Sequence, residues 1–510
     1  MKHKLLAIVY FLIFTTTAYC IGFDVKTGSP IIAPGFEMLG NYKGSWYTIE
    51  FDKPGNLNKP PKYKISKYAP GFGTGKTSIL YNSFGEKTHY LQAAFINNKI
   101  SLFYAVCEKR EDEESLRDNR DGRKIMPIIM QQDFDVNTLE PIGNATVLLD
   151  QKDEYFAASA IEIVHSLDYS KSAIVIKPYY KHQKYKVIIW DNTRGAVTQK
   201  TFDFKLMKTY LMFIQSAISN SGQIYLVTKV RDDILTYQII SKDKSETTYH
   251  VFSIDKNSKE PATVELKSPN TGKYFQTPIV SALASNEFVV AFDYYTDIKS
   301  QTFKGTSLFK YDASLNATGK RDVTPSENFI EKTNTYHIFK KGNEFSNLKL
   351  QKIVALDDAN FMLLAEYVDT VAHTLKNLIT STERNYLICY RMDETMNVKA
   401  QHLLDKKQKS AIVNYAFSAQ VSRKGNEFYV FYNGDWETDD ENAMNLQCAR
   451  FATDGSAPEI RKVVNTSNNF FIKMENSYTS GTNKIVFEEH KLVEYQDITR
   501  EIKLVEITLK

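Results

Sequence analysis

Hydrophobic and polar residues alternate with a period of two along most of this chain, in short runs separated by Gly, Asn, Asp and Ser. The clearest example is the segment 417–454, where the runs FSAQV, EFYVFY and NLQCARF are separated by the turn RKGN and by a polar loop. Runs of this kind, bounded by turn-forming residues, predict antiparallel β-strands. Almost no stretch has the 3.6-residue period of a helix, so the expected fold class is all-β.

A strand that ends on an aspartate occurs repeatedly and marks a repeating unit. In each unit an apolar strand and a turn precede the aspartate, and a short turn leads from it to the next strand. An Asp side chain can accept a hydrogen bond from the backbone N–H two residues on, so we expect these aspartates to close Asx-turns rather than to bind metal. The aspartates are Asp135, Asp191, Asp255, Asp312, Asp393 and Asp454.

Each unit contains about four strands over roughly 50–80 residues, which is typical of a β-propeller blade. Six complete units and one closing unit predict seven blades, with six and eight as the alternatives. The last segment, 484–510, lacks the Asp turn, and we expect it to pair with the strand 45–51 so that the two ends of the chain close the ring. Residues 44–510 are expected to form a single propeller domain, after a lead-in at 21–43 that has no clear period.

The N-terminal residues 1–20 have a basic start, an apolar core and a run of mostly small residues, which is the pattern of a secretory signal. Ala18 and Cys20 predict cleavage near Cys20. Lipidation of Cys20 is the alternative, but Tyr19 stands where lipoprotein signals place a small residue. We therefore expect an exported protein, in the periplasm or at the cell surface or outer membrane. No later run approaches the ~18 apolar residues of a transmembrane helix.

Composition adds two limits. The chain has 64 Lys and Arg against 60 Asp and Glu, a net charge of +4, without a dominant basic block. Because phosphate binding needs concentrated positive charge, nucleic acid is not expected as a partner. The 31 Tyr and 31 Phe against 22 Gly and 14 Pro suit a strand-rich protein, since aromatic side chains pack well on pleated surfaces.

The cysteines and histidines give no sign of a metal centre. Cys107, Cys389 and Cys448 have no metal-like spacing and lie in apolar strand patterns, so we expect small buried hydrophobic side chains and no disulfide framework. The histidines form neither H-x-H, H-x-x-x-H nor H-E-x-x-H. No G-x-S-x-G nucleophile motif is present, and no catalytic residue can be assigned.

The segment PGFGTGKTS at 70–78 resembles a phosphate-binding P-loop in its Gly-Lys-Thr step. Pro70 occupies the place of the first glycine of that motif. The following residues, SILYNSFGEK, also lack the pattern of the helix whose N-terminus would hold the phosphate. We interpret the segment as a loop, and no nucleotide cofactor is expected.

The loop NGDWETDDEN is the best candidate for a binding site. Its carboxylates offer hard oxygen ligands, so calcium is one interpretation and a solvated acidic loop is the other. Its tryptophan, if exposed, would suit a sugar ring or a protein partner. The candidate residues are Asn433, Asp435, Trp436, Asp439, Asp440, Glu441 and Asn442.

Three motifs resemble uncharacterised secreted or periplasmic β-propeller proteins of Bacteroidota. They are the strand ending in DKKQ at 405–408, the Ser-containing strand at 417–421, and the strand that enters an aromatic-Asn-Asp loop at Tyr432, Asn433 and Asp435, with a further Asn at 442. The resemblance implies a propeller fold and an exported location. It implies no activity.

Three functional hypotheses remain. The first is a non-catalytic propeller that binds a protein or glycan partner in the bacterial cell envelope, as an accessory subunit of an outer-membrane complex. The alternative is a glycan-cleaving enzyme whose carboxylates are carried on loops. The third is a purely structural subunit of a secretion or motility apparatus, which a large apolar side patch would indicate.

Overall fold

The computed structural model consists of β-strands, turns and bends in the part of the chain that it describes. No helix long and apolar enough to cross a membrane occurs in that part. The described residues are 22–28, 31–33, 35–51, 62–69, 72, 76–80, 88–96, 98–106, 128–150, 161–167, 170–176, 184–191, 197–203, 210–231, 249–266, 273–275, 278–283, 285–296, 304–324, 339–340, 344–345, 348–356, 360–372, 380–410, 419–424, 427–434, 445–452, 456–465, 470–480, 483–491 and 500–510.

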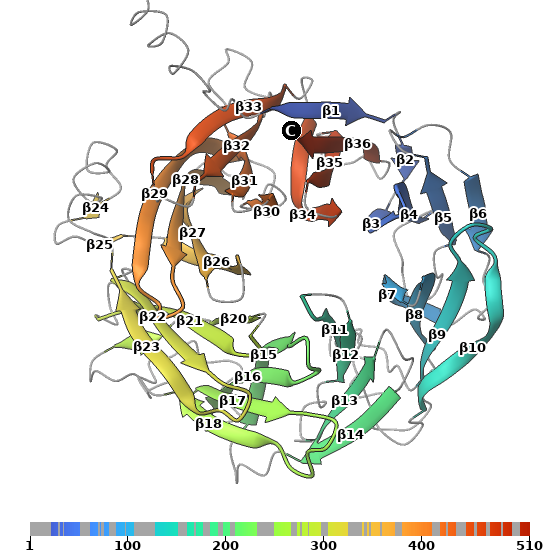
Figure 1. The fold of residues 1–510 in the computed structure, drawn as a ribbon, viewed down its shortest axis with the longest axis horizontal. Coiled ribbons are helices and arrows are strands. Elements are labelled where there is room, and N and C mark those ends of the chain that lie inside the picture. Colours follow the sequence, from blue (N-terminus) through green and yellow to red (C-terminus); the bar gives the residue numbers. More distant parts are fainter. Residues whose placement is uncertain are drawn as a thin grey trace, which may run out of the picture.

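The described strands form eight antiparallel sheets arranged around a central axis (Figure 1). This arrangement is a β-propeller, which confirms the predicted fold class. The number of blades is eight, one of the two alternatives to the preferred seven. We number the blades 1 to 8 in chain order, and in each blade we distinguish an inner, a second, a third and an outer strand, counted from the axis.

The strands of the eight blades follow the same order. The inner strands are β3 (Gly35–Tyr42), β7 (Thr88–Ile96), β11 (Ile161–His165), β15 (Tyr210–Ile218), β20 (Ile279–Ala282), β26 (Leu348–Ala355), β30 (Gln420–Lys424) and β34 (Phe470–Ser480). The second strands are β4 (Ser45–Phe51), β8 (Lys99–Val106), β12 (Lys171–Ile176), β16 (Ile224–Arg231), β21 (Phe288–Tyr295), β27 (Phe361–Ala372), β31 (Glu427–Gly434) and β35 (Lys484–Lys491).

The outer half of each blade is built in the same way. The third strands are β5 (Tyr63–Tyr68), β9 (Ile128–Asp135), β13 (Lys184–Asp191), β17 (Tyr249–Ile254), β22 (Gly305–Tyr311), β28 (Thr380–Met392), β32 (Asn445–Phe451) and β36 (Arg500–Leu509). The outer strands are β6 (Lys76–Leu80), β10 (Pro141–Asp150), β14 (Val197–Asp203), β18 (Ala262–Leu266), β23 (Ala317–Val323), β29 (Val398–Ser410), β33 (Glu459–Asn465) and β1 (Phe23–Thr27).

Four short strands lie outside this order. β19 (Tyr274–Phe275) pairs with β21 in blade 5, β2 (Ile31–Ala33) pairs with β36 in blade 8, and β24 (Phe339–Lys340) pairs with β25 (Glu344–Phe345).

The N-terminal strand β1 closes the ring as the outer strand of blade 8. It pairs with β36 from Phe23 opposite Leu509 to Thr27 opposite Val505. The prediction that N- and C-terminal strands close the ring is confirmed, but the closing strand is β1 and not 45–51, because 45–51 forms the second strand of blade 1. The lead-in 21–43, which has no clear period, contains β1, β2 and β3. β1 is only five residues long and mostly exposed or half-buried, so it has little hydrophobic pattern to recognise.

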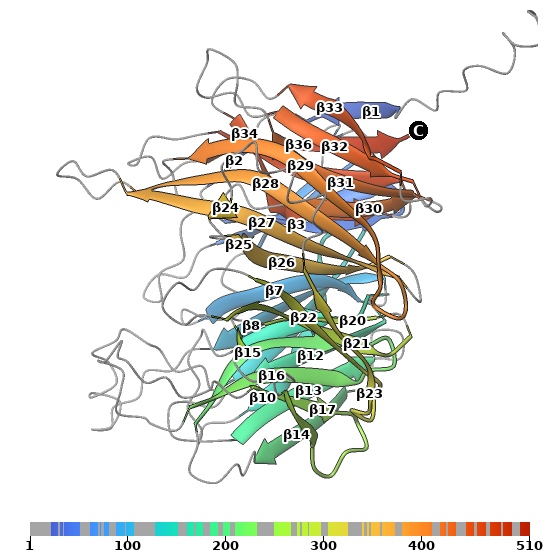
Figure 2. The same ribbon diagram turned by 90° about the vertical axis from the view of Figure 1, so that its left-hand side faces the viewer.

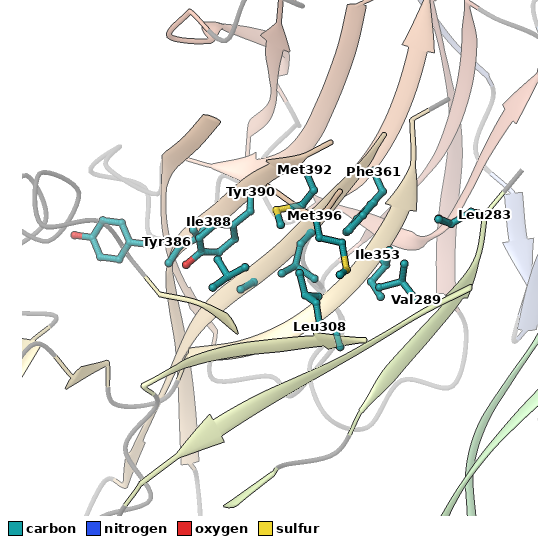
Figure 3. Close-up of a cluster of buried hydrophobic side chains, with 14 residues drawn as sticks. Leu283, Val289, Leu308, Ile353, Phe361, Tyr386, Ile388, Tyr390, Met392 and Met396 are labelled. Atoms are coloured by element: carbon teal, nitrogen blue, oxygen red, sulfur yellow. The ribbon is translucent and has the colours of Figure 1, made fainter. Parts of the chain in front are cut away.

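The second and third strands are almost continuously apolar because both faces of each sheet are covered by a neighbouring blade. In blade 6, Phe361 and Leu363 pack toward blade 5, whereas Met362 and Leu364 pack toward blade 7. Figure 3 shows the cluster between blades 5 and 6. The core is therefore a series of apolar layers between blades.

The Asp turns form as predicted wherever the structure describes them. In four blades the Asp Oδ1 accepts a hydrogen bond from the backbone N–H two residues on. The pairs are Asp135 with Asn137 (2.7 Å), Asp255 with Asn257 (2.6 Å), Asp312 with Ser314 (2.9 Å) and Asp393 with Thr395 (3.0 Å). Asp191 ends β13 and pairs with Lys171 at 3.0 Å, and Asp454 lies outside the described residues.

The Asp turns also link neighbouring blades. In three blades, the residue two positions before the turn Asp donates a hydrogen bond from its side chain to a backbone carbonyl of the next blade, which lies in the Asp turn or directly after the third strand. The pairs are Ser253 with Ala313 (3.0 Å) and Lys310 with Glu394 (3.1 Å), and Arg391 donates to Ala452 (3.1 Å). Each bond crosses to the next blade, so these contacts help to fix the spacing of the ring.

Candidate functional site

The two faces of the ring differ in how the strands are joined. On one face, inner strands turn into second strands and third strands turn into outer strands, for example at 43–44, 136–140, 219–223, 255–261, 312–316 and 393–397. We call this the turn face. On the opposite face, second strands lead to third strands through 52–62, 107–127, 177–183, 232–248, 296–304, 373–379, 435–444 and 492–499. We call this the long-connection face, and Figure 2 shows the ring from the side.

Both described chain ends lie on the turn face. β1 is antiparallel to β36, so its first residue stands beside the end of that strand. The Lys510 N–H donates to the Gly22 carbonyl at 2.9 Å, and the Leu509 N–H donates to the Asn483 carbonyl at 2.8 Å. The long-connection face is thus opposite Gly22 and Lys510.

The predicted binding loop belongs to the long-connection face of blade 7. It joins the second strand β31 to the third strand β32. Asn433 lies within β31 and is only 1% exposed. The other six predicted residues, Asp435, Trp436, Asp439, Asp440, Glu441 and Asn442, lie outside the described residues.

A buried polar side chain occupies the same position of the second strand in blades 5, 6 and 7. In each of these blades, a phenylalanine of the second strand pairs with the last residue of the third strand. The buried polar residue follows five positions after that phenylalanine, and it is Asp293, Glu366 or Asn433. Asp293 is 3% exposed and Glu366 is 0% exposed. Since alternate residues of a strand share a face, each of the three continues the apolar face that packs on the next blade.

Asp293 connects blades 5 and 6. Its Oδ2 accepts a hydrogen bond from the Leu350 N–H of the inner strand β26 at 2.7 Å, and its Oδ1 accepts from the Thr306 hydroxyl at 3.2 Å. Burial raises the pKa of Asp293 to about 7, and these two hydrogen bonds oppose that shift. Burial also raises the pKa of nearby Tyr390, with a smaller contribution from the charge of Asp293. Asp293 therefore carries a proton for much of the time at neutral pH.

Glu366 is held by an ion pair within blade 6. The Lys406 Nζ lies 2.5 Å from the Glu366 Oε1, and both side chains are completely buried. A carboxylate and an ammonium group removed from water in this way stabilise each other, while the loss of either leaves an expensive buried charge. This carboxylate is therefore fixed by the fold rather than presented to solvent.

Sequence reasoning missed Asp293 and Glu366 as special positions. The signal is nevertheless present in the sequence, because each is an acidic residue that ends a continuous apolar run, FVVAFD in one case and FMLLAE in the other. A carboxylate next to so many buried positions needs a partner, which the next blade or the outer strand supplies.

The other predicted positions have structural roles where they are described. Lys76 and Thr77 of the Gly-Lys-Thr step begin the strand β6, so the interpretation of 70–78 as a loop was wrong for residues 76–78, and a strand rather than a P-loop helix occupies 76–80. Cys389 and Cys448 are free and buried, as predicted, and Cys107 lies outside the described residues. Among the described residues, no group of three His, Cys, Asp or Glu side chains could hold a metal ion.

One histidine joins two inner strands. The His165 Nε2 lies 2.9 Å from the Gln92 Nε2 of the preceding blade, and its Nδ1 lies 2.7 Å from the Ser172 Oγ. Burial lowers the pKa of His165 to about 4, so the ring is neutral at pH 7. Ser172 is itself fully buried, so this Ser-His pair cannot receive a substrate as a nucleophile and its base.

No protein-family model matches this chain, and no curated protein matches it either. Solved structures with a similar fold include prolyl oligopeptidase B from Galerina marginata, which is 12% identical and has a TM-score of 0.38. The alignment covers 92% of this chain and 55% of the peptidase. The chain thus spans about half the length of that peptidase.

Two further structures are covered over nearly their full length. The β-propeller domain of the Trilobed protease from Pyrococcus furiosus has 10% identity and a TM-score of 0.33, covering 93% of this chain and 99% of that one. The WD40 domain of SCAP from fission yeast has 9% identity and a TM-score of 0.37, covering 95% of this chain and 98% of that one. No conclusion about function follows from likenesses at this level.

Proposed function

We propose that this chain is a non-catalytic, exported β-propeller that binds a protein or glycan partner through its long-connection face, in the cell envelope of a diderm bacterium. In this role it is an accessory subunit of an outer-membrane complex. The observation that carries the proposal is the location of the described chain ends. They lie together on the turn face, where the Lys510 N–H donates a hydrogen bond to the Gly22 carbonyl. A propeller attached through either end presents the long-connection face to a partner.

The blade 7 connection 435–444 supports the same choice of face. It contains Trp436 among five carboxylates, and a tryptophan next to polar groups is typical of the residues that dominate binding energy. The turn face is occupied by short turns whose polar groups are largely used in Asx-turns and in bonds between blades.

A glycan-cleaving enzyme is the alternative, and Asp293 is the observation in its favour. A general acid needs a carboxyl group whose pKa is raised toward neutrality, as it is here. However, Asp293 is 3% exposed, and both of its oxygens accept hydrogen bonds from the fold. Glu366, at the same position of the next blade, is completely buried against Lys406. Binding is therefore the function that we propose.

The proposal is tested with the full chain, biotinylated at its N-terminus and immobilised so that the turn face meets the support. Envelope extracts and a glycan array are passed over it. Trp436→Ala is expected to weaken capture at least about tenfold, since a central tryptophan of an interface is worth roughly 2 kcal/mol or more.

Leu167→Ala is the matched control. Leu167 is a large apolar side chain on the turn face and is 48% exposed, so its loss should leave capture unchanged. Absence of any stoichiometric partner and of any retained glycan would contradict the proposal. So would an equal loss of capture in the two variants.

A further inference from the structure

Blades 3 and 4 meet through an apolar layer that becomes polar toward the long-connection face. Near the turn face the layer contains Ile224 and Leu226 of β16 and, on the paired strand β17, Ile254 and Phe252. These residues alternate along their strands, so the next positions on the same face are Thr228 and His250. Thr228 and His250 are direct partners in the register of β16 and β17.

The inner strands contribute to the same polar end of the layer. Ile218 of β15 belongs to the apolar layer, and Ser216, two residues before it, shares its face. From blade 3, Glu162 stands opposite Val175 in the register of β11 and β12, and Val175 also belongs to this layer. Two hydroxyls, an imidazole and a carboxylate thus face one seam between two blades.

Two of these side chains are buried without a hydrogen-bond partner among the described residues. Thr228 is 0% exposed and Ser216 is 5% exposed, and neither hydroxyl forms a hydrogen bond within the described part of the chain. A buried hydroxyl that makes no hydrogen bond destabilises the folded state, because it has lost its bonds to water. Native proteins avoid this cost for most buried polar groups, often with an internal water.

The spacing of the two hydroxyls fits a single bridging molecule. Ser216 is opposite Leu226, so Thr228 is its diagonal neighbour on the same face of the sheet. Diagonal neighbours are about 7–8 Å apart between Cα atoms, which is too far for two short side chains to bond directly but suits a water between them. We propose that the seam between blades 3 and 4 binds an internal water molecule, held by the hydroxyls of Thr228 and Ser216.

The seam also supplies further hydrogen-bonding groups for this water. A buried water makes about three hydrogen bonds, and Glu162 and His250 lie on the same layer as the two hydroxyls. The water is then a structural component of the protein. It forms hydrogen bonds with polar side chains at the point where the apolar packing between the two blades ends.

The test compares Thr228→Val with Thr306→Val in the full chain. Thr306 is buried too, but its hydroxyl donates to Asp293, so its loss should raise the unfolding equilibrium constant about fivefold or more. If Thr228 holds a water, Thr228→Val raises the constant in the same way. A constant that is lower than that of the wild type, or within twofold of it, means that the hydroxyl was unsatisfied and overturns the proposal.

A high-resolution crystal structure gives a second, independent result. We expect an ordered water about 2.7–3.2 Å from both the Thr228 Oγ1 and the Ser216 Oγ. Absence of density between the two oxygens overturns the proposal. Unfolding is also measured in sodium, potassium and choline salts at equal ionic strength. Equal stabilities support a water, whereas a difference between the salts assigns the position to a cation and overturns it.

Discussion

Asp293→Asn should remove most of the pH dependence that one buried carboxyl group imposes on stability. In the folded protein its pKa is raised to about 7 from an ordinary value near 3.8, so the folded state holds a proton that the unfolded state releases. Stability is therefore largest below about pH 4 and is lost as pH rises through 7. A shift of roughly three units at 1.36 kcal/mol each corresponds to about 4 kcal/mol.

Asparagine fits the same position without ionising. Its Oδ1 can accept from the Leu350 N–H, and its amide can donate to the Thr306 hydroxyl. We expect the free energy of unfolding of the variant to be close to that of the wild type near pH 4 and to become larger than it as pH rises to 8. The difference between the two proteins should grow by about 4 kcal/mol over this range. Urea unfolding followed by tryptophan fluorescence between pH 4 and 8 measures this difference.

Asp312→Asn serves as the control. The pKa of Asp312 is lowered by its hydrogen bonds with Asn316 and Ser314, so its titration contributes to stability only at acid pH. Its effect should be constant between pH 5 and 8. If the Asp293→Asn difference were equally constant over that range, Asp293 would not titrate there and the reasoning would be refuted.

Three further outcomes follow from contacts between strands. Lys406→Met leaves the buried Glu366 carboxylate unpaired and should cost about 3–5 kcal/mol in urea unfolding, whereas the double variant with Glu366→Gln should recover part of this loss. Trp46→Phe removes the 2.6 Å hydrogen bond from the Trp46 Nε1 to Glu506 between blades 1 and 8, and should cost about 1.5–3 kcal/mol in the same assay. Deletion of β1 exposes the edge of β36, so hydrogen exchange of that strand should accelerate in mass spectrometry while the strands of blade 4 remain protected.

The blade pattern could be predicted from the sequence because the second strands are buried apolar runs and the third strands of blades 2 to 7 lead to an aspartate. Blades 2 to 7 contain the six aspartates, and the prediction found all six of these units. Blade 1 has no such mark, since β5 ends at Tyr68 and is followed by Ala69. The prediction therefore merged the strands of blade 1 with the C-terminal segment and arrived at seven blades instead of eight.

The buried polar positions were harder to predict, because their partners come from strands that are distant in the sequence, in the next blade for Asp293 and in the same blade for Glu366. Asp293 bonds to Leu350, which is 57 residues away, and Glu366 pairs with Lys406, which is 40 residues away. No local pattern joins such residues. The acidic ends of the apolar runs could have been noticed, but their partners depend on the register between sheets.

The most direct test of the account is a disulfide between the two ends of the ring. A Cβ atom at Gly22 would stand 3.0 Å from the Cβ of Lys510, close to the ~3.8 Å of a disulfide, and both residues are at the chain ends, where a small adjustment is easy. The double variant Gly22→Cys and Lys510→Cys is oxidised, digested and analysed by mass spectrometry. The account predicts an intramolecular disulfide between residues 22 and 510. Free thiols at both positions, or disulfides only between separate molecules, would contradict a ring that closes with its two ends together on the turn face.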